Sequence, residues 1–189
     1  MIIQPIEDSE IYGIKIITPQ IHKDDRGYFF ESYNANDFNK LGLLTKFVQD
    51  NQAYSKKGTI RGLHFQLKYP QGKLVRVIKG EVFDVAVDIR RGSPTFGKYV
   101  GVNLSDKNNK IVYIPEGFAH GYVVLSETAI FQYKCTEIYH PEDEYGLLWN
   151  DKDLNIQWPV KNPILSEKDK SLPTLQLIKE NKLPKFRNY

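Results

Sequence analysis

A row of short apolar segments, each ended by turn-forming residues, restricts the fold of this chain more than any other feature. The segments are rich in Val, Ile and Phe, and the breaks between them carry Gly, Pro, Asn or Asp. They cover residues 12–19, 28–33, 47–54, 59–66, 73–79, 81–90, 99–104, 111–114, 121–125 and 128–139. Short strands repeated in this way predict an all-β sandwich or closed barrel and argue against alternating helix and strand units.

Helical structure is predicted at two places. In 35–44, Phe38, Leu41 and Leu44 recur at near-helical spacing, and Asn34 is a candidate N-cap. From Gly146 onward the chain is rich in Pro and Trp, which predicts loops and short helices that pack over the barrel. The length of 189 residues predicts one domain, 1–189.

Composition restricts the cellular compartment and the classes of binding partner that we expect. Hydrophobic residues make up 41% of the chain, enough for a core without disulfides, and Cys135 is the single cysteine. We therefore expect a reducing, cytoplasmic location. No signal peptide is expected, and no stretch approaches the ~18 apolar residues of a membrane helix. The net charge of +3 is spread along the chain, which argues against nucleic acid and is compatible with an anionic small substrate.

Residues 81–90 form the clearest predicted strand, with two distinct faces. One side carries Phe83, Val85, Val87 and Ile89, and the other carries Val82, Asp84, Ala86 and Asp88. If the second side lines a barrel, Asp84 is buried and needs a cationic partner, for which Lys73 is a candidate. The strand by itself favours the simpler interpretation, in which both acids face solvent.

The motif Arg61-Gly62-Leu63-His64-Phe65-Gln66 places a histidine on the polar face of a strand. Gly62 allows another backbone to approach closely. Arg61 is a fixed cation with bidentate geometry for phosphate. Next to Arg61 and Gly62, His64 is a candidate general base. A histidine base usually needs a carboxylate that orients its second ring nitrogen. The residues themselves do not reveal which carboxylate that is.

A second histidine motif, Pro115 to His120, tests for a metal. It resembles the second signature of cupin barrels, in which the histidine can bind a metal. The first cupin signature supplies His-x-His and then a glutamate, whereas this chain has His64-Phe65-Gln66. Two histidines without a third ligand make a poor metal site. The motifs thus predict a cupin-type jelly-roll barrel without a metal, in which His120 either contacts a ligand or is structural.

Two further groups are candidates for the same pocket. Lys73, in Gly72-Lys73-Leu74-Val75, places a cation beside an apolar strand. Tyr133 shares a face with Phe131 and Cys135, where a tyrosine is either a core residue or a general acid. Tyr139 is either a loop residue or a stacking platform.

Together these motifs resemble the dTDP-4-dehydrorhamnose 3,5-epimerase family. The matching stretches keep the family's order through most of the chain: 25–31, 47–51, 60–66, 71–77, 80–97, 114–121, 133–141 and 165–169. The resemblance implies a metal-free cupin jelly roll that works as a homodimer and without a cofactor. It also implies conversion of dTDP-4-dehydro-6-deoxy-D-glucose to dTDP-4-dehydro-L-rhamnose.

The resemblance implies a role for each matching residue. His64 matches the base that removes the protons at C3 and C5, and Asp169 matches the acid that orients it. Tyr133 matches the acid that returns a proton from the other face, and Lys73 matches the group that stabilises the enolate oxygen. Positions that hold the nucleotide, pyrophosphate or sugar match Arg26, Glu31, Gln49, Asn51, Arg61, His120, Glu144 and Lys168. Lys73 and Tyr139 complete the predicted substrate contacts.

Two other functions stay open at this level. A 3- or 5-monoepimerase or a ketoisomerase on a related nucleotide sugar needs the same histidine base, so the motif does not separate them. A non-catalytic cupin that only binds a sugar is the second alternative. The presence of His64, Lys73, Tyr133 and Asp169 in one chain argues against it.

Overall fold

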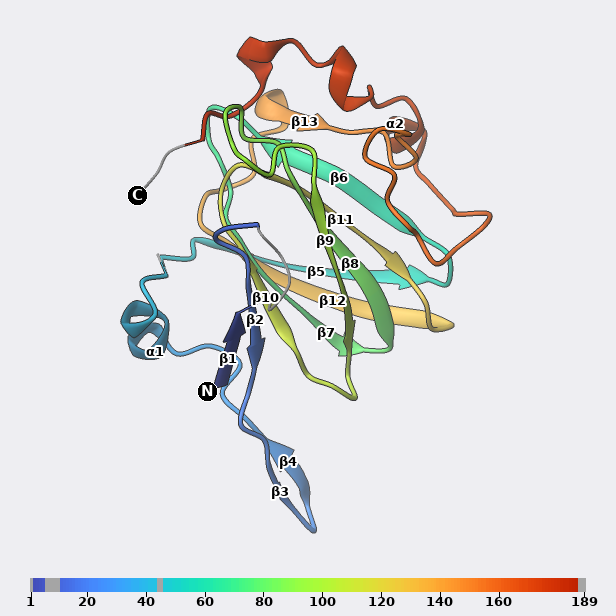
Figure 1. Cartoon of the computed structure of the whole chain (residues 1–189). Helices are drawn as coiled ribbons and strands as arrows, with labels where there is room; N and C mark the ends of the chain where they lie inside the picture. The colour runs from blue at the N-terminus through green and yellow to red at the C-terminus, as the bar shows by residue number, and fades with distance from the viewer. Residues whose placement is uncertain (1, 6–10, 44–45, 187–189) are drawn as a thin grey trace.

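The computed structural model describes residues 2–5, 11–43 and 46–186, and most of its regular structure is β-strand (Figure 1). The strands are β1 Ile2–Pro5, β2 Lys15–Thr18, β3 His22–Asp24, β4 Gly27–Phe29, β5 Gln49–Lys56, β6 Ile60–Gln66, β7 Lys73–Lys79, β8 Glu81–Asp88, β9 Tyr99–Ser105, β10 Ile111–Ile114, β11 Phe118–Val124, β12 Thr128–Cys135 and β13 Glu144–Gly146. Two short α-helices are present, α1 Ala35–Lys40 and α2 Glu167–Lys170.

Two antiparallel sheets face each other around a common core. The first has the order β1-β2-β10-β7-β12-β5, and the second has the order β13-β6-β11-β8-β9. Side chains from both sheets meet inside, among them Val75 and Phe131 from the first and Val82 and Tyr122 from the second. This arrangement confirms the predicted all-β, cupin-type jelly-roll barrel with short peripheral helices. A separate hairpin of β3 and β4 extends away from the barrel (Figure 1).

The predicted strand boundaries hold well in the barrel and fail at its rim. Residues 73–79 and 111–114 form strands with the predicted ends. Strand β11 begins at Phe118, so His120 lies on a strand and not in the preceding loop. Strand β12 ends at Cys135, and the hydroxyl of the next residue, Thr136, accepts a hydrogen bond from the Gly72 N–H at 2.8 Å.

The predicted helix is present but shorter than expected. Asn34 is the N-cap, and its Oδ1 accepts a hydrogen bond from the Asn36 N–H at 3.0 Å. Phe38 is fully buried, whereas Leu41 at the end of the helix is 42% exposed. Leu44, the third residue of the predicted apolar stripe, lies outside the described residues. Among the described helices, none has the length and apolar character of a membrane-spanning segment.

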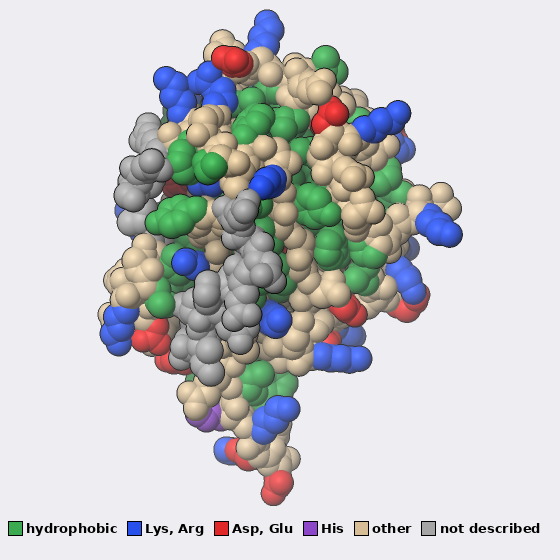
Figure 2. Space-filling model, in the orientation of Figure 1, with side chains coloured by type: hydrophobic (Ala, Val, Ile, Leu, Met, Phe, Trp, Pro, Cys, Tyr) green, Lys and Arg blue, Asp and Glu red, His purple; other side chains and the backbone are tan. Residues whose placement is uncertain are grey.

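The C-terminal segment covers the outer face of the five-stranded sheet (Figure 1). Its leucines pack against Val85 and Val87 on the outward side of β8 and against Ile89 just after the strand. These leucines are Leu147, Leu154, Leu175 and Leu183. Strand β8 is therefore buried on both faces. On the face in Figure 2, basic and acidic side chains are interspersed, with hydrophobic side chains between them.

Burial of β8 overturns the expectation that its two acids face solvent. Asp84 is 2% exposed and Asp88 is 0% exposed. The partner of Asp84 also differs from the prediction, because the His120 ring nitrogen Nε2 lies 2.8 Å from its Oδ2. Lys73 only adds a longer-range charge. Asp84 shares the inward face of β8 with Val82 and Ala86, which pack against Val75 and Phe131 of the other sheet. That sheet is built from distant parts of the chain, so the pattern of one strand did not reveal the burial.

Asp88 anchors the turn that follows β8. The Arg90 guanidinium donates to both of its oxygens, at 2.9 and 2.7 Å, and the hydroxyls of Ser93 and Thr95 each donate at 2.6 Å. Burial by itself raises the pKa of the Asp88 carboxyl, but these hydrogen bonds outweigh it and hold that pKa below its usual value. Arg90 also stacks over Phe118, so the cluster braces the start of β11.

We expect Asp88→Ala to lower the free energy of unfolding by about 3–5 kcal/mol, because it removes the carboxylate that neutralises the buried Arg90 charge. Because the folded pKa of Asp88 is depressed, its contribution is present at neutral pH and is lost as the pH falls below the ~3.9 of a free aspartate. Urea unfolding at pH 7 and at pH 3–4 measures both effects. Glu127→Gln, which breaks an exposed pair with Lys57, is the control and should cost at most ~1 kcal/mol. Equal, small losses for both variants would contradict this account.

Candidate active site

A cavity of about 430 Å³ opens inside the barrel. It is lined by Ala53, Thr59, Ile60, Arg61, His64, Lys73, His120, Gly121, Tyr122, Phe131, Tyr133, Ile164, Leu165, Ser166, Lys168 and Asp169. The barrel strands β6, β7, β11 and β12 contribute most of these side chains, and helix α2 contributes the last two. The structure thus brings together seven of the residues predicted from the sequence: Arg61, His64, Lys73, His120, Tyr133, Lys168 and Asp169.

His64 enters the cavity because of how β6 pairs with β11. His64 lies opposite His120 in the ladder, while its neighbours Leu63 and Phe65 point to the outer core under the C-terminal segment. The two strands approach closely at a glycine, as the motif predicted. A Cβ atom on Gly62 would lie 2.4 Å from the His120 carbonyl oxygen, so only glycine fits at this crossing.

Asp169 fixes one side of the His64 ring. The Ser166 hydroxyl caps α2 by accepting from the Asp169 N–H at 3.1 Å, and the Asp169 Oδ1 lies 2.7 Å from His64 Nε2. Burial by itself raises the pKa of the Asp169 carboxyl. The hydrogen bond and the charge of His64 and the hydrogen bond to Ser166 together outweigh burial, so the pKa is lowered overall. The ionised carboxylate accepts a hydrogen bond from the Nε2–H group of His64. The lone pair of the neutral ring is therefore on Nδ1, as a base requires.

Glu144 joins the rim of the cavity into one network. Its Oε1 lies 3.5 Å from His64 Nδ1, and its Oε2 accepts from the Tyr139 hydroxyl at 2.8 Å and from the Lys168 ammonium. Burial favours a higher pKa for Glu144, but the bonds from Lys168 and Tyr139 and the charge of His64 lower it overall. The Tyr139 N–H donates to Gln49 Oε1 at 2.7 Å.

Gln49 extends this network to Asn51. Its Nε2 donates to Asn51 Oδ1 at 3.1 Å, and Asn51 lies opposite Tyr133 on the neighbouring strand. Of the predicted residues in this network, only Lys168 lines the cavity. Hydrogen bonds connect the other four to it: Gln49, Asn51, Tyr139 and Glu144.

Lys73 and Tyr133 bring two further polar groups into the apolar interior. Burial lowers the pKa of the Lys73 ammonium, while Cys135, Asp84 and Glu144 oppose that shift. Burial raises the pKa of the Tyr133 hydroxyl to about 12, so it carries its proton at neutral pH. The structure therefore provides a cation and a proton donor in the same cavity as the His64 lone pair.

The His120–Asp84 pair is a second dyad that sequence reasoning did not find. Both side chains point into the barrel, and His120 is 7% exposed. In the β11–β8 ladder His120 lies opposite Ala86, and Asp84 lies two residues further along on the same face. The alternation of side chains along β8 indicated that Asp84 could be buried. Only the register of β11 against β8 identifies His120 as its partner.

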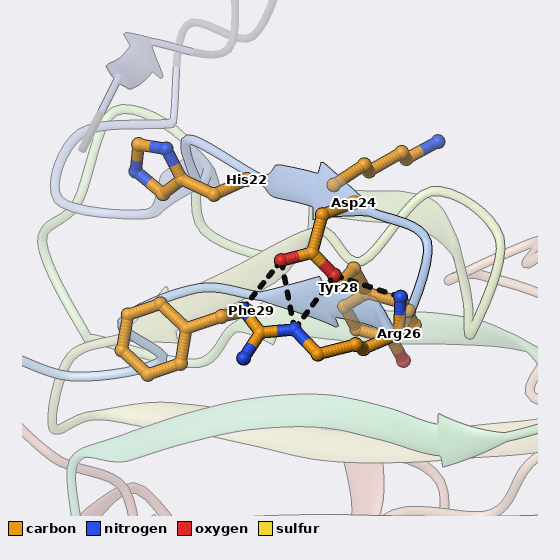
Figure 3. Close-up of a pocket in the computed structure, with 7 residues that line it drawn as sticks. His22, Asp24, Arg26, Tyr28 and Phe29 are labelled. Atoms are coloured by element: carbon orange, nitrogen blue, oxygen red, sulfur yellow. Dashed lines mark hydrogen bonds and ion pairs between the residues drawn. The ribbon is translucent and has the colours of Figure 1, made fainter.

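Two predicted substrate residues lie away from the cavity. Arg26 is on the β3–β4 hairpin, where its guanidinium pairs with Asp24 at 2.6 Å (Figure 3). Glu31 follows β4 and accepts a hydrogen bond from Asn34 at 3.2 Å. Neither is among the residues that line the cavity. The same hairpin exposes the rings of Tyr28 and Phe29, at 58% and 68%.

The donor set of the cavity suits acid–base chemistry. Across 2–5, 11–43 and 46–186, the structure contains no group of three or more His, Cys, Asp or Glu side chains that could hold a metal ion. An oriented imidazole, a buried ammonium and a protonated phenol can instead remove a proton, stabilise the resulting oxyanion and return a proton.

Known proteins share this sequence and fold. Residues 8–176 match the family model described as dTDP-4-dehydrorhamnose 3,5-epimerase. The dTDP-4-dehydrorhamnose 3,5-epimerase of Shigella flexneri is 56% identical over 163 residues, covering 85% of this chain and 90% of the relative. The dTDP-6-deoxy-D-glucose-3,5-epimerase of Legionella pneumophila, solved in complex with dTDP-4-keto-L-rhamnose, is 50% identical with a TM-score of 0.92, covering 95% and 97% of the two chains.

A more distant neighbour has narrower chemistry. A 3'-monoepimerase from Streptomyces bikiniensis, solved in complex with dTDP-quinovose, is 34% identical with a TM-score of 0.89, covering 94% and 91% of the two chains. The family model spans most of the chain, and the sequence identity to the Shigella relative is high over most of both chains. The chain therefore belongs to the dTDP-4-dehydrorhamnose 3,5-epimerase family, whose members are isomerases.

Proposed function

We propose that this protein inverts C3 and C5 of dTDP-4-dehydro-6-deoxy-D-glucose to give dTDP-4-dehydro-L-rhamnose. The observation that carries the proposal is the His64–Asp169 dyad, with Nε2 and Oδ1 2.7 Å apart, in one cavity with Lys73 and Tyr133. The named activities of the similar proteins support the same substrate.

In the proposed mechanism, His64 Nδ1 removes the proton beside the C4 ketone. Negative charge then develops on the carbonyl oxygen, where the Lys73 ammonium stabilises it in a site sheltered from water. Inversion requires the new proton to arrive on the opposite face of the sugar. The Tyr133 hydroxyl is the proposed donor, since it is protonated at neutral pH. The chemistry involves no redox step and needs no cofactor.

The charged rim is the proposed binding site for the nucleotide diphosphate. Arg61 and Lys168 line the cavity and offer cations to an anionic ligand. His120, Gln49, Asn51, Tyr139 and Glu144 supply the remaining polar contacts proposed for the sugar and nucleotide. A monoepimerase on a related nucleotide sugar is the second candidate, favoured by the 3'-monoepimerase from Streptomyces bikiniensis among the structural neighbours.

We also propose that the protein acts as a homodimer in the cytoplasm. The β3–β4 hairpin carries Arg26 and two exposed aromatic rings away from its own cavity, with Glu31 just after it (Figures 1 and 3). Exposed apolar rings on a projecting hairpin are typical of a surface that another protein chain covers. We infer that it contributes Arg26 and Glu31 to the partner's site. The buried, unpaired thiol of Cys135 is compatible with a reducing compartment.

Incubation with dTDP-4-dehydro-6-deoxy-D-glucose in heavy water is expected to place deuterium at both C3 and C5 and to yield the L-sugar, as followed by NMR. Deuterium with inversion at a single centre would identify a monoepimerase. Absence of exchange at both positions would sink the proposed chemistry and leave the binding-only cupin.

Tyr133→Phe should separate exchange from inversion. His64 and Lys73 still form the enolate, so deuterium should still enter the sugar, while inversion becomes slow without the acid. Tyr54→Phe, which removes a hydroxyl from an exposed ring on β5, is the matched control and should behave as wild type. Wild-type inversion by Tyr133→Phe would remove the acid role from this residue.

Substitution of the base, His64, should lower the rate more than substitution of its orienting acid, Asp169. His64→Ala should lower kcat by at least ~10²-fold, since general-base catalysis typically contributes 10²–10⁴. Asp169→Ala should cost less, because the imidazole remains although it is misoriented. Steady-state kinetics on the two purified variants tests this order, and equal mild losses would show that His64 is not the base.

A mixing experiment tests the shared site. His64→Ala and the double variant Arg26→Ala, Glu31→Ala should each be weakly active alone. After dissociation and reassociation at equal amounts, half of the dimers pair one variant with the other, and one of their two sites is intact. The mixture should recover about a quarter of the wild-type activity. No recovery, or a mass of 21.9 kDa by light scattering at micromolar concentration, would contradict the shared site.

A further inference from the structure

Tyr122 places a buried hydroxyl in the barrel without a fixed partner. It lies on β11, is 4% exposed, and stacks on Phe131 with ring centroids 4.1 Å apart and planes 20° from parallel. Its ring lines the cavity with Arg61 and His64. Its hydroxyl oxygen is buried and accepts or donates no hydrogen bond of good geometry to any described residue.

Ser55 and Arg61 are the polar neighbours of this hydroxyl. Both lie close enough to lower its pKa, although burial outweighs them and the pKa is raised overall. These two neighbours are already joined to each other, because Arg61 Nε donates to Ser55 Oγ at 3.0 Å. The phenol therefore keeps its proton and has an unused donor beside the Arg61 guanidinium.

An unpaired buried hydroxyl is costly, and native proteins rarely keep one without a use. A phenylalanine would fill the same space and stack on Phe131 equally well. Tyrosine at this position is therefore explained best by a partner that arrives with the substrate.

We propose that Tyr122 is a further substrate-binding residue, whose hydroxyl donates a hydrogen bond to an oxygen of the bound nucleotide sugar next to Arg61. The inference rests on the proposed function of the cavity. When the Arg61 guanidinium leaves Ser55 for the anionic part of the substrate, the hydroxyl beside it becomes accessible. The acceptor is either a phosphate oxygen or a sugar oxygen, and both have the same chemistry.

Tyr122→Phe tests the proposal, with Tyr113→Phe as the matched control. Tyr113 is also a buried tyrosine, but it belongs to a cluster next to α1 and does not line the cavity. Tyr122→Phe should raise KM about 10-fold, as expected for one lost hydrogen bond to a charged or polar acceptor. Its kcat should change little, because binding is weakened in ground state and transition state alike. Its thermal midpoint should fall little, because the hydroxyl makes no hydrogen bond of good geometry that the phenylalanine would lose.

Calorimetry with dTDP and with the dTDP sugar identifies the acceptor. Weaker binding of both ligands indicates a phosphate oxygen, and weaker binding of the dTDP sugar alone indicates a sugar oxygen. Either result supports the proposal. Unchanged KM and unchanged binding overturn it, and so does a fall in thermal midpoint with a parallel loss of kcat, which indicates a structural hydroxyl. If the wild-type enzyme epimerises nothing, the proposed function fails, while the dTDP titration still reports on Tyr122.

Discussion

The attachment of the C-terminal segment to the five-stranded sheet is the constraint on which the whole site depends. Ile164 exchanges backbone hydrogen bonds with both sides of the turn before β6, at 2.8 Å to Gly58 and 2.9 Å from Ile60. Close behind it, α2 brings Asp169 to within 2.7 Å of His64, although the two residues are 105 positions apart. The imidazole and its orienting carboxylate therefore exist as a pair only when barrel and tail have both folded.

The barrel holds its buried acids by giving each a specific partner. Asp84 meets His120, Asp88 meets Arg90 and two hydroxyls, and Asp169 meets His64. Because burial penalises an unpaired charge, these contacts fix the side chains in one arrangement before a ligand arrives. The polar interior is in this sense prearranged, which is the condition for stabilising charge that develops only in a transition state.

Local patterns predicted the parts of this structure that depend on neighbours in sequence, and they failed where distant segments meet. Alternation in β6 correctly placed His64 on one face and Leu63 on the other, and Asn34 marked the start of α1. The pattern of β8 favours solvent for Asp84, because the sheet that covers its inward face is formed by distant segments of the chain. The pairing of Asp84 with His120 depends on the register of β8 against β11, and the position of Arg26 depends on the direction of the β3–β4 hairpin. The sequence of one segment determines neither the register nor this direction.

The ion pair between Lys168 and Glu144 gives the Lys168 ammonium a counterion from the protein itself. If the nucleotide diphosphate binds this ammonium as proposed, it replaces the Glu144 carboxylate as the partner of Lys168. The displaced Glu144 keeps the Tyr139 hydroxyl as a partner and stays next to His64. Under the proposed function, ligand binding by Lys168 is thus an exchange of partners. The net free energy of that contact is the difference between two anions competing for one cation, which is smaller than the attraction of either anion alone.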